Sequence, residues 1–241
     1  MDRMERTVTS AEIIRLEGMV PFGVGGRRLC YTHPAAQDLC VKVLRQDDRR
    51  TIRMNRRTLI PAGLRRKYDN NAHELKVLTA LFHRIGSAAD QHLPRCYGMF
   101  DTDQGPGLVL HLVRDHDGRI SRSLRELLSI GYDPQEFRPA FEVLGDFMLK
   151  HVVITRALLD HNVVARLRSD GQWQLYIIDG LGDRAWLPMA TWLRPLGEAK
   201  VRRRLAEAWT RFEQFHRSGG VTPELISASS WGQGFLNHRG D

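Results

Sequence analysis

Four polar side chains, met in a fixed order along the chain, carry the chemistry needed to hold a metal-bound nucleotide. Lys42 lies inside the apolar run 39–44, and Glu74 lies in a helical stretch downstream. A lysine ammonium can bind phosphate oxygens, and a paired carboxylate fixes its direction. Asn162 and Asp179 offer the hard oxygen ligands that Mg²⁺ prefers. The four residue types therefore suit phosphoryl transfer, which depends on positioning and charge neutralisation.

A glycine-rich turn, Gly23-Val24-Gly25-Gly26, precedes the four polar residues. Because glycine lacks a Cβ, such a turn lets backbone N–H groups approach phosphates closely. The turn matches a GxGxxG motif only at its first two glycines, and a glycine turn between strands is more often a plain hairpin. We take Gly23, Gly25 and Gly26, together with Lys42, as candidate nucleotide-binding residues.

Hydrophobic periodicity predicts the elements that position Lys42 and Glu74. Residues 20–44 read as strand, glycine turn, strand, turn and strand, with Lys42 in the last strand. Residues 68–85 predict a helix with Asp69, Asn70 or Asn71 as its N-cap and Gly86 at its end. This helix places Glu74 at the edge of its apolar face. Burying a carboxylate at this position costs free energy unless it pairs with a cation. We therefore expect Glu74 to form an ion pair with Lys42.

A second pattern positions Asn162 and Asp179. Residues 163–167 and 173–178 predict a hairpin, with Asn162 just before its first strand and Asp179 just after its second. Because a hairpin brings the two ends of its strands together, we expect these side chains to lie close to each other.

The order of elements predicts an α+β fold with two lobes. A small antiparallel sheet comes first, completed by strands at 93–101 and 108–113, and helices at 123–130, 134–152 and 197–215 follow. We expect residues 1–116 to form the sheet-containing lobe and residues 117–217 the mainly helical lobe. Residues 218–241 are rich in Gly and Ser and predict a mobile tail.

With these residues in place, the chain resembles the protein-kinase-like superfamily and, more narrowly, the family of PhoP-regulatory-network proteins, the YrbL family. The similar segments are 29–34 (LCYTHP), 40–43 (CVKV), 73–76 (HELK), 93–98 (LPRCYG), 179–182 (DGLG) and 187–192 (LPMATW). The resemblance implies a small two-lobed bacterial kinase fold with ATP and Mg²⁺ as cofactors. It implies that Lys42 and Glu74 form the phosphate-orienting pair and that Asn162 and Asp179 bind the metal.

One part of the kinase pattern is missing. In the kinase loop HRDxxxxN the Asp accepts the proton of the substrate hydroxyl, and here that position, five residues before Asn162, is Ala157. Asp160 is the nearest carboxylate in the loop, and we retain it with Lys42 and Glu74 as a candidate catalytic residue. Losing a general base typically costs about 10²–10⁴ in rate. Both a phosphotransferase and a catalytically impaired pseudokinase that acts as a regulatory binding module are therefore consistent with the sequence.

The charge distribution leaves a third alternative. The 241 residues carry a formal charge of +8, and from Arg49 to Lys67 there are eight basic residues and no acidic one. Such a segment, within an insertion at 45–67, favours an anionic partner: a membrane surface, a phosphorylated substrate or nucleic acid. The chain could thus be a polyanion binder, or a phosphotransferase acting on a small or lipid-linked acceptor and linked to a bacterial regulatory response.

Other functional classes lack their signatures. No GxxxxGK[ST] loop, HExxH motif or CxxC pair occurs, and the three cysteines are widely spaced. No apolar run approaches the roughly 18 residues needed to span a bilayer, and the first residues lack the apolar stretch of a signal peptide. We therefore expect a cytoplasmic protein.

Overall fold

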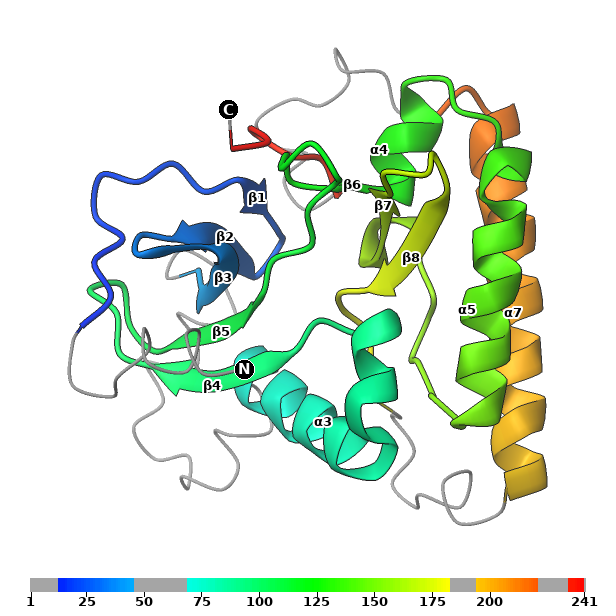
Figure 1. Ribbon diagram of the computed structural model, residues 1–241, viewed down its shortest axis with the longest axis horizontal. Helices are drawn as coiled ribbons and strands as arrows, with labels where there is room; N and C mark the ends of the chain where they lie inside the picture. The colour runs from blue at the N-terminus through cyan, green and yellow to red at the C-terminus, as the bar shows by residue number, and fades with distance from the viewer. Residues whose placement is uncertain (1–12, 46–68, 183–193, 221–233, 241) are drawn as a thin grey trace.

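The computed structural model describes residues 13–45, 69–182, 194–220 and 234–240. These residues form a mixed α+β arrangement with a five-stranded antiparallel sheet, a three-stranded antiparallel sheet and several helices (Figure 1). The predicted α+β class is confirmed, and the two sheets are compatible with a two-lobed molecule. The basic segment from Arg49 to Lys67 lies outside the described residues, as do residues 187–192.

The five-stranded sheet has the order β1-β2-β3-β5-β4. Its strands are β1 (Gly23–Val24), β2 (Arg28–His33), β3 (Ala36–Leu44), β4 (Cys96–Phe100) and β5 (Gly107–His111). The register places Cys30 opposite Lys42 and Lys42 opposite Leu108. Because side chains alternate between the faces of a sheet, Arg28 falls on the same face as Cys30 and Lys42.

The opposite face of this sheet is a separate apolar core. Tyr31, Val41, Val43 and Val109 are buried there with Leu16, which comes from the segment before β1. The sheet is therefore packed on both faces, and the face that carries Lys42 is the one turned toward the rest of the molecule.

Helix α3 (Asn70–Ile85) lies against the sheet and carries Glu74. It begins where the Asp69 carboxylate accepts hydrogen bonds from the N–H groups of Asn71 and Ala72, and it ends at Gly86 with φ 70°. Leu78 and Leu81 are buried from one stripe of the helix. Asp69 is one of the three N-caps that the sequence allows, and the buried stripe is the predicted one. A short 3₁₀ helix, η1 (Gly86–Gln91), leads from α3 toward β4.

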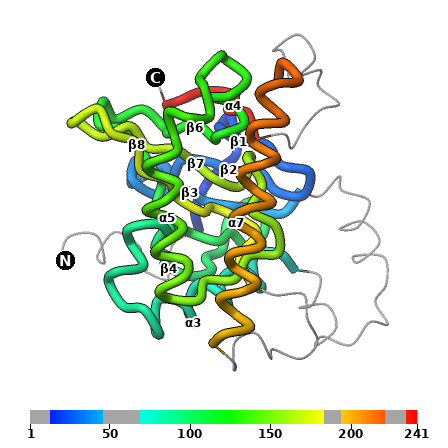
Figure 2. The backbone as a smooth tube through the Cα atoms, turned by 90° about the vertical axis from the view of Figure 1, so that its right-hand side faces the viewer, coloured from blue at the N-terminus to red at the C-terminus, as the bar shows by residue number. Residues whose placement is uncertain are grey.

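The remaining elements are the three strands of the second sheet, which has the order β6-β7-β8, and the helices near it. In chain order they are β6 (Arg122–Ser123), α4 (Leu124–Ser129), η2 (Pro134–Phe137), α5 (Arg138–Lys150), η3 (Asp160–Asn162), β7 (Val163–Leu167), β8 (Trp173–Ile177) and α7 (Arg194–Arg217). Helices α5 and α7 run side by side (Figures 1 and 2), with the Phe141 ring 5.1 Å from Trp209 and 5.7 Å from Phe212. No helix among the described residues is long and apolar enough to cross a membrane.

The last described segment, residues 234–240, returns between β1 and β6 (Figure 1). Leu236 forms an antiparallel bridge with Gly23, the Asn237 N–H donates to the Phe22 carbonyl at 2.7 Å, and the Ile120 N–H donates to the Arg239 carbonyl at 2.9 Å. We expected residues 218–241 to form a mobile tail, but this part of it is hydrogen bonded to two distant stretches of chain. The Gly and Ser content does not indicate this, because main-chain pairing leaves little trace in composition.

Candidate functional site

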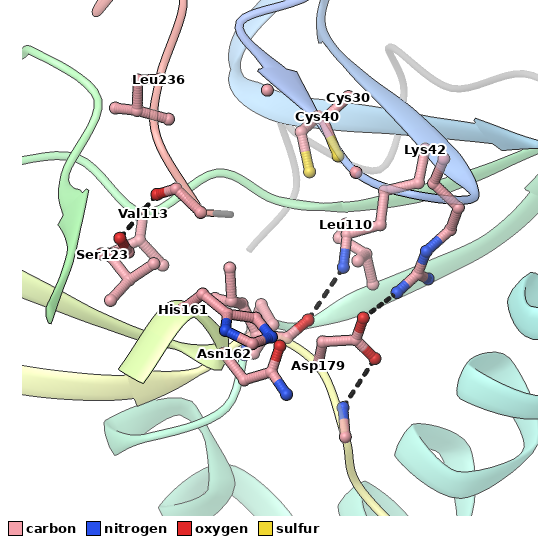
Figure 3. Close-up of a pocket in the computed structure, with 18 of the residues that line it drawn as sticks. Cys30, Cys40, Lys42, Leu110, Val113, Ser123, His161, Asn162, Asp179 and Leu236 are labelled. Carbon is pink, nitrogen blue, oxygen red and sulfur yellow. Dashed lines mark hydrogen bonds and ion pairs between the residues drawn. The ribbon is translucent and has the colours of Figure 1, made fainter. Parts of the chain in front are cut away.

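A cavity of about 530 Å³ lies between the five-stranded sheet and the β7–β8 hairpin, and Figure 3 shows part of its wall. This volume falls within the range of roughly 300–1,000 Å³ that small-molecule sites occupy. One part of the wall is apolar, with Leu112 and four side chains labelled in Figure 3: Cys30, Cys40, Leu110 and Val113. Lys42, Asn162 and Asp179 line the same cavity. The structure therefore brings residues from β3, η3 and the end of β8 to one site.

Lys42 and Glu74 meet at the sheet side of the cavity. The Lys42 Nζ donates to Glu74 Oε1 at 2.8 Å and to the Ile178 carbonyl at 2.9 Å, and both side chains are buried. Burial alone would lower the pKa of Lys42, but the Glu74 carboxylate outweighs it and leaves the pKa above its ordinary value. Lys42 is thus a fixed cation whose direction is set by α3 and by the main chain after β8.

Arg28 joins this pair from the neighbouring strand. One arm of its guanidinium, Nη1, donates to Glu74, and the other, Nη2, lies 2.5 Å from Asp179 Oδ2. Burial would lower the pKa of Arg28, but the carboxylates of Glu74 and Asp179 raise it further, so the group stays charged. We call Arg28, Lys42, Glu74 and Asp179 the cavity cluster.

Asn162 and Asp179 lie beside each other, as the predicted hairpin requires (Figure 3). The Ile178 N–H donates to the Asn162 carbonyl at 2.9 Å. Gly180 has φ 80°, and a Cβ there would come within 3.1 Å of the Asn162 amide nitrogen and 3.2 Å of the Ala157 carbonyl oxygen. Only glycine suits this turn, which holds the Asn162 amide against the segment that carries the Asp179 carboxylate.

The Asp179 carboxylate is charged and reachable. Burial would raise its pKa, but the nearby Arg28 and Lys42 cations outweigh that effect and hold the pKa well below its usual range. Its side chain is 50% exposed. A carboxylate and an adjacent amide oxygen fit Mg²⁺, which takes few ligands from protein and the rest from phosphate and water. Within the part of the chain that the structure describes, no group of three or more His, Cys, Asp and Glu residues could hold a metal by itself.

The loop before η3 brings no second carboxylate to the cavity. Ala157 lines the wall beside Arg156, and the main-chain N–H of Arg156 donates to the Gly180 carbonyl at 2.8 Å. Asp160, which we retained as a candidate catalytic residue, is 1% exposed and is absent from the wall. Its two oxygens pair with Arg125 at 2.8 and 3.0 Å instead.

Asp160 also contacts His161, with Nδ1 3.4 Å from Oδ1. Burial would raise the pKa of Asp160, but the contacts from His161 and Arg125 outweigh it and lower the pKa to about 2. We call Arg125, Asp160 and His161 the loop cluster. Of its three members, His161 alone lines the cavity.

The glycine turn reaches the cavity as well. Gly23, Gly25 and Gly26 all line the wall. The Gly25 N–H donates to the Arg28 carbonyl at 2.8 Å, so this amide is already used within the turn. The turn therefore shapes the wall, and the buried cations beside it carry the positive charge.

Sequence reasoning missed the C-terminal part of the wall. Gly234 and Leu236 line the cavity, the Ser123 hydroxyl donates to the Gly234 carbonyl at 2.6 Å, and the Leu236 N–H donates to the Glu126 carboxylate at 3.2 Å. A Cβ on Gly234 would lie 2.4 Å from the Cβ of His161, so a larger residue cannot take this place. No periodicity or motif in the sequence signals this return of the chain.

Comparison with known proteins gives a consistent family match. The family model described as "PhoP regulatory network protein YrbL" matches residues 14–213. Two relatives, both titled "Uncharacterized protein YrbL", come from Escherichia coli (strain K12) and Shigella flexneri. Each is 26% identical over 183 residues, which cover 75% of this chain and 79% of the relative. The residues matched by the family model include both sheets, α3 and most of α7.

Proposed function

The chain belongs to the PhoP regulatory network YrbL family, and we propose that its cavity binds a magnesium–nucleotide within a two-lobed, protein-kinase-like fold. One observation carries the proposal. Among the described residues, the cavity wall holds four cations, Arg27, Arg28, Lys42 and Arg156, against one carboxylate, Asp179, and with the buried Glu74 behind the wall counted as well the excess is two positive charges. A wall with this excess of fixed positive charge suits a multiply charged anion such as a triphosphate.

The individual roles follow from the contacts. Lys42, directed by Glu74, would bind phosphate oxygens, since its Nζ lies at the cavity wall and its carboxylate partner is buried behind it. Asn162 and Asp179 would supply the two protein ligands of Mg²⁺. Bound Mg²⁺ would neutralise charge on the phosphate oxygens.

The apolar part of the wall would contact the nucleobase of the ligand. Cys30 and Cys40 lie on adjacent strands and face the cavity with Leu110, Leu112 and Val113. Both thiols remain protonated, because burial raises the pKa of Cys30 and raises that of Cys40 to about 12. They therefore act as small apolar groups, which suit a flat aromatic base.

The geometry favours nucleotide binding over fast phosphate transfer. Ala157 and the cation Arg156 occupy the stretch of wall where a kinase places its carboxylate base, and Asp160 is held by Arg125 behind the wall. We therefore propose a nucleotide-binding regulatory protein. The family description connects its members to the PhoP regulatory network, and a role there is part of this proposal.

A second candidate, slow phosphate transfer, is favoured by the position of His161. Its ring lines the cavity next to Asn162, and its Nδ1 faces the Asp160 carboxylate at 3.4 Å. His161 Nε2 could take the proton of an acceptor hydroxyl while the hydroxyl oxygen bonds to the terminal phosphorus and the bond to the nucleoside diphosphate breaks. His161→Gln should then abolish ATP turnover while Mg·ATP affinity stays within about threefold.

Thermal denaturation with and without Mg·ATP tests the nucleotide site. At a ligand concentration about 100-fold above Kd, the wild-type Tm should rise by roughly 5–10 °C. Lys42→Ala and Asp179→Ala should each lose this shift, because one removes the phosphate cation and the other the metal carboxylate. Matched controls are Lys150→Ala and Asp146→Ala, two exposed residues of α5, which should keep it. Unchanged shifts in both cavity variants would refute the assignment.

A further inference from the structure

Arg28 occupies an unusual position in the cavity cluster because it joins the two carboxylates. Its side chain is 9% exposed and lines the cavity wall. Nη1 donates to Glu74 and lies 3.4 Å from the Asn71 amide oxygen, while Nη2 lies 2.5 Å from Asp179. The planar fork of arginine can reach two acceptors in this way, and a lysine ammonium at the same place could not.

The cluster is electrically balanced without a ligand. Arg28 and Lys42 contribute two positive charges, and Glu74 and Asp179 contribute two negative charges. Buried charges are costly unless paired, so this balance stabilises the empty cavity. Arg28 is thus the cation that pairs directly with Asp179 in the empty cavity.

A divalent cation at Asp179 would upset this balance. Two positive centres would then share one carboxylate, and their repulsion at such short range favours separation of the guanidinium from Asp179. Nη1 keeps a partner in Glu74, so only the Nη2 arm loses its acceptor. The nearest anion entering the cavity would be the phosphate chain of the ligand, and Arg28 already lies in the wall beside the glycine turn.

We propose that Arg28 is a phosphate-binding residue that exchanges partners. In the empty cavity its Nη2 pairs with Asp179. When a divalent cation coordinates Asp179, Nη2 binds the phosphates of the ligand instead. The inference rests on the proposed nucleotide site and deepens it. Lys42 differs from Arg28, because its Nζ is held by Glu74 and the Ile178 carbonyl and makes no ion pair with Asp179.

The proposal predicts effects of opposite sign when Arg28 is removed. Asp179 loses a competing cation, so a divalent metal alone should bind more tightly. The phosphate chain loses a partner, so a polyphosphate without metal should bind more weakly. An arginine with a merely structural role would weaken both ligands or neither.

Two titrations measure these effects on the full chain. Mn²⁺ binding is followed by water proton relaxation, and inorganic tripolyphosphate binding is followed by calorimetry in EDTA. Arg28→Ala should bind Mn²⁺ about tenfold more tightly and tripolyphosphate about tenfold more weakly than wild type. Arg168→Ala, an exposed arginine in the β7–β8 turn, is the matched control and should change neither affinity.

Arg28→Lys keeps the test decisive if Arg28→Ala does not fold. It retains a cation beside Glu74, but a single ammonium cannot hold both carboxylates at the arginine distances. The same two signs are expected, with smaller changes. Circular dichroism of each variant establishes that it is folded before titration.

The outcomes separate this inference from the proposed function. If Arg28 variants weaken Mn²⁺ and tripolyphosphate alike, or change neither, Arg28 is structural and the inference is overturned. The nucleotide site still stands in that case, provided that Mg·ATP stabilisation depends on Lys42 and Asp179. A wild type that binds Mg·ATP but no tripolyphosphate in EDTA also overturns the Arg28 role. A wild type that binds none of these ligands overturns both.

Discussion

The cavity cluster and the loop cluster each contain an ion pair between an arginine and an aspartate, but the two carboxylates differ in exposure and in their partners. Asp179 is half-exposed in the cavity wall, where its Oδ2 pairs with one arm of Arg28 and its Oδ1 accepts a hydrogen bond from the Gly180 N–H at 2.6 Å. Asp160 is 1% exposed and is held at both oxygens by Arg125. A half-exposed carboxylate can accept a ligand from the cavity side, whereas a fully buried one whose two oxygens both pair with the same arginine cannot do so without disrupting its surroundings.

This contrast assigns the two aspartates to different tasks. Asp160 ties the η3 turn to α4 and so fixes the loop that carries Ala157 and Asn162. Asp179 faces the cavity. Proximity to Asn162 in the sequence made Asp160 a catalytic candidate, but its burial and its partner point to an anchoring role.

The largest expected effect comes from the shared carboxylate of the cavity cluster. Glu74→Gln leaves two buried cations, Lys42 and Arg28, without their common partner, and should lower the free energy of unfolding by about 3–5 kcal/mol. Urea denaturation measures this. Glu142→Gln, which breaks an exposed pair with Arg138, should cost no more than about 1 kcal/mol. Equal losses in the two variants would mean that the cavity cluster contributes no more than a surface pair.

A smaller effect is expected in the loop cluster, and it depends on pH. The pKa of Asp160 in the folded protein is about 2, below its value of about 4 in an unfolded chain. Its ionised form therefore stabilises the fold above pH 4, and this contribution is lost as the pH falls toward 2. Asp160→Asn should cost about 2–3 kcal/mol at pH 7, and urea denaturation of wild type and variant should converge between pH 4 and pH 2. A constant difference over that range would contradict the ion-pair account.

The smallest effect on stability is expected at Asp179. Asp179→Asn removes a half-exposed carboxylate and leaves Arg28 paired with Glu74, so the free energy of unfolding should change by no more than about 1 kcal/mol. The same denaturation experiment at pH 7 tests this value. A loss as large as that of Glu74→Gln would show that Asp179 is also an anchoring residue, and the contrast between the clusters would fail.

Much of the fold follows from local sequence patterns. The Asp69 cap, the apolar stripe of α3 and the Gly86 stop are all short-range signals, and the structure has each of them. The meeting of Lys42 and Glu74 was also predictable, because each is a charge in an apolar setting that needs a partner. These inferences need no knowledge of distant contacts.

The parts that escaped prediction depend on distant pairing. The double role of Arg28 requires the β2–β3 register and the position of the chain after β8. The partner of Asp160 lies on α4, and the residues 234–240 that close the wall are fixed by main-chain bonds to β1 and β6 regions. None of these contacts leaves a periodic or compositional signal, so only the folded chain reveals them.

One calorimetric comparison tests the central claim, that the cavity cluster binds ligand and the loop cluster only supports it. Mg·ATP is titrated into wild type, Asp179→Asn and Asp160→Asn at pH 7 and a temperature at which all three are folded. We predict that Asp179→Asn lowers the affinity by about 30-fold or more, because a charged partner of the ligand is lost, while Asp160→Asn stays within about threefold of wild type. Equal losses in the two variants, or a larger loss in Asp160→Asn, would contradict the account.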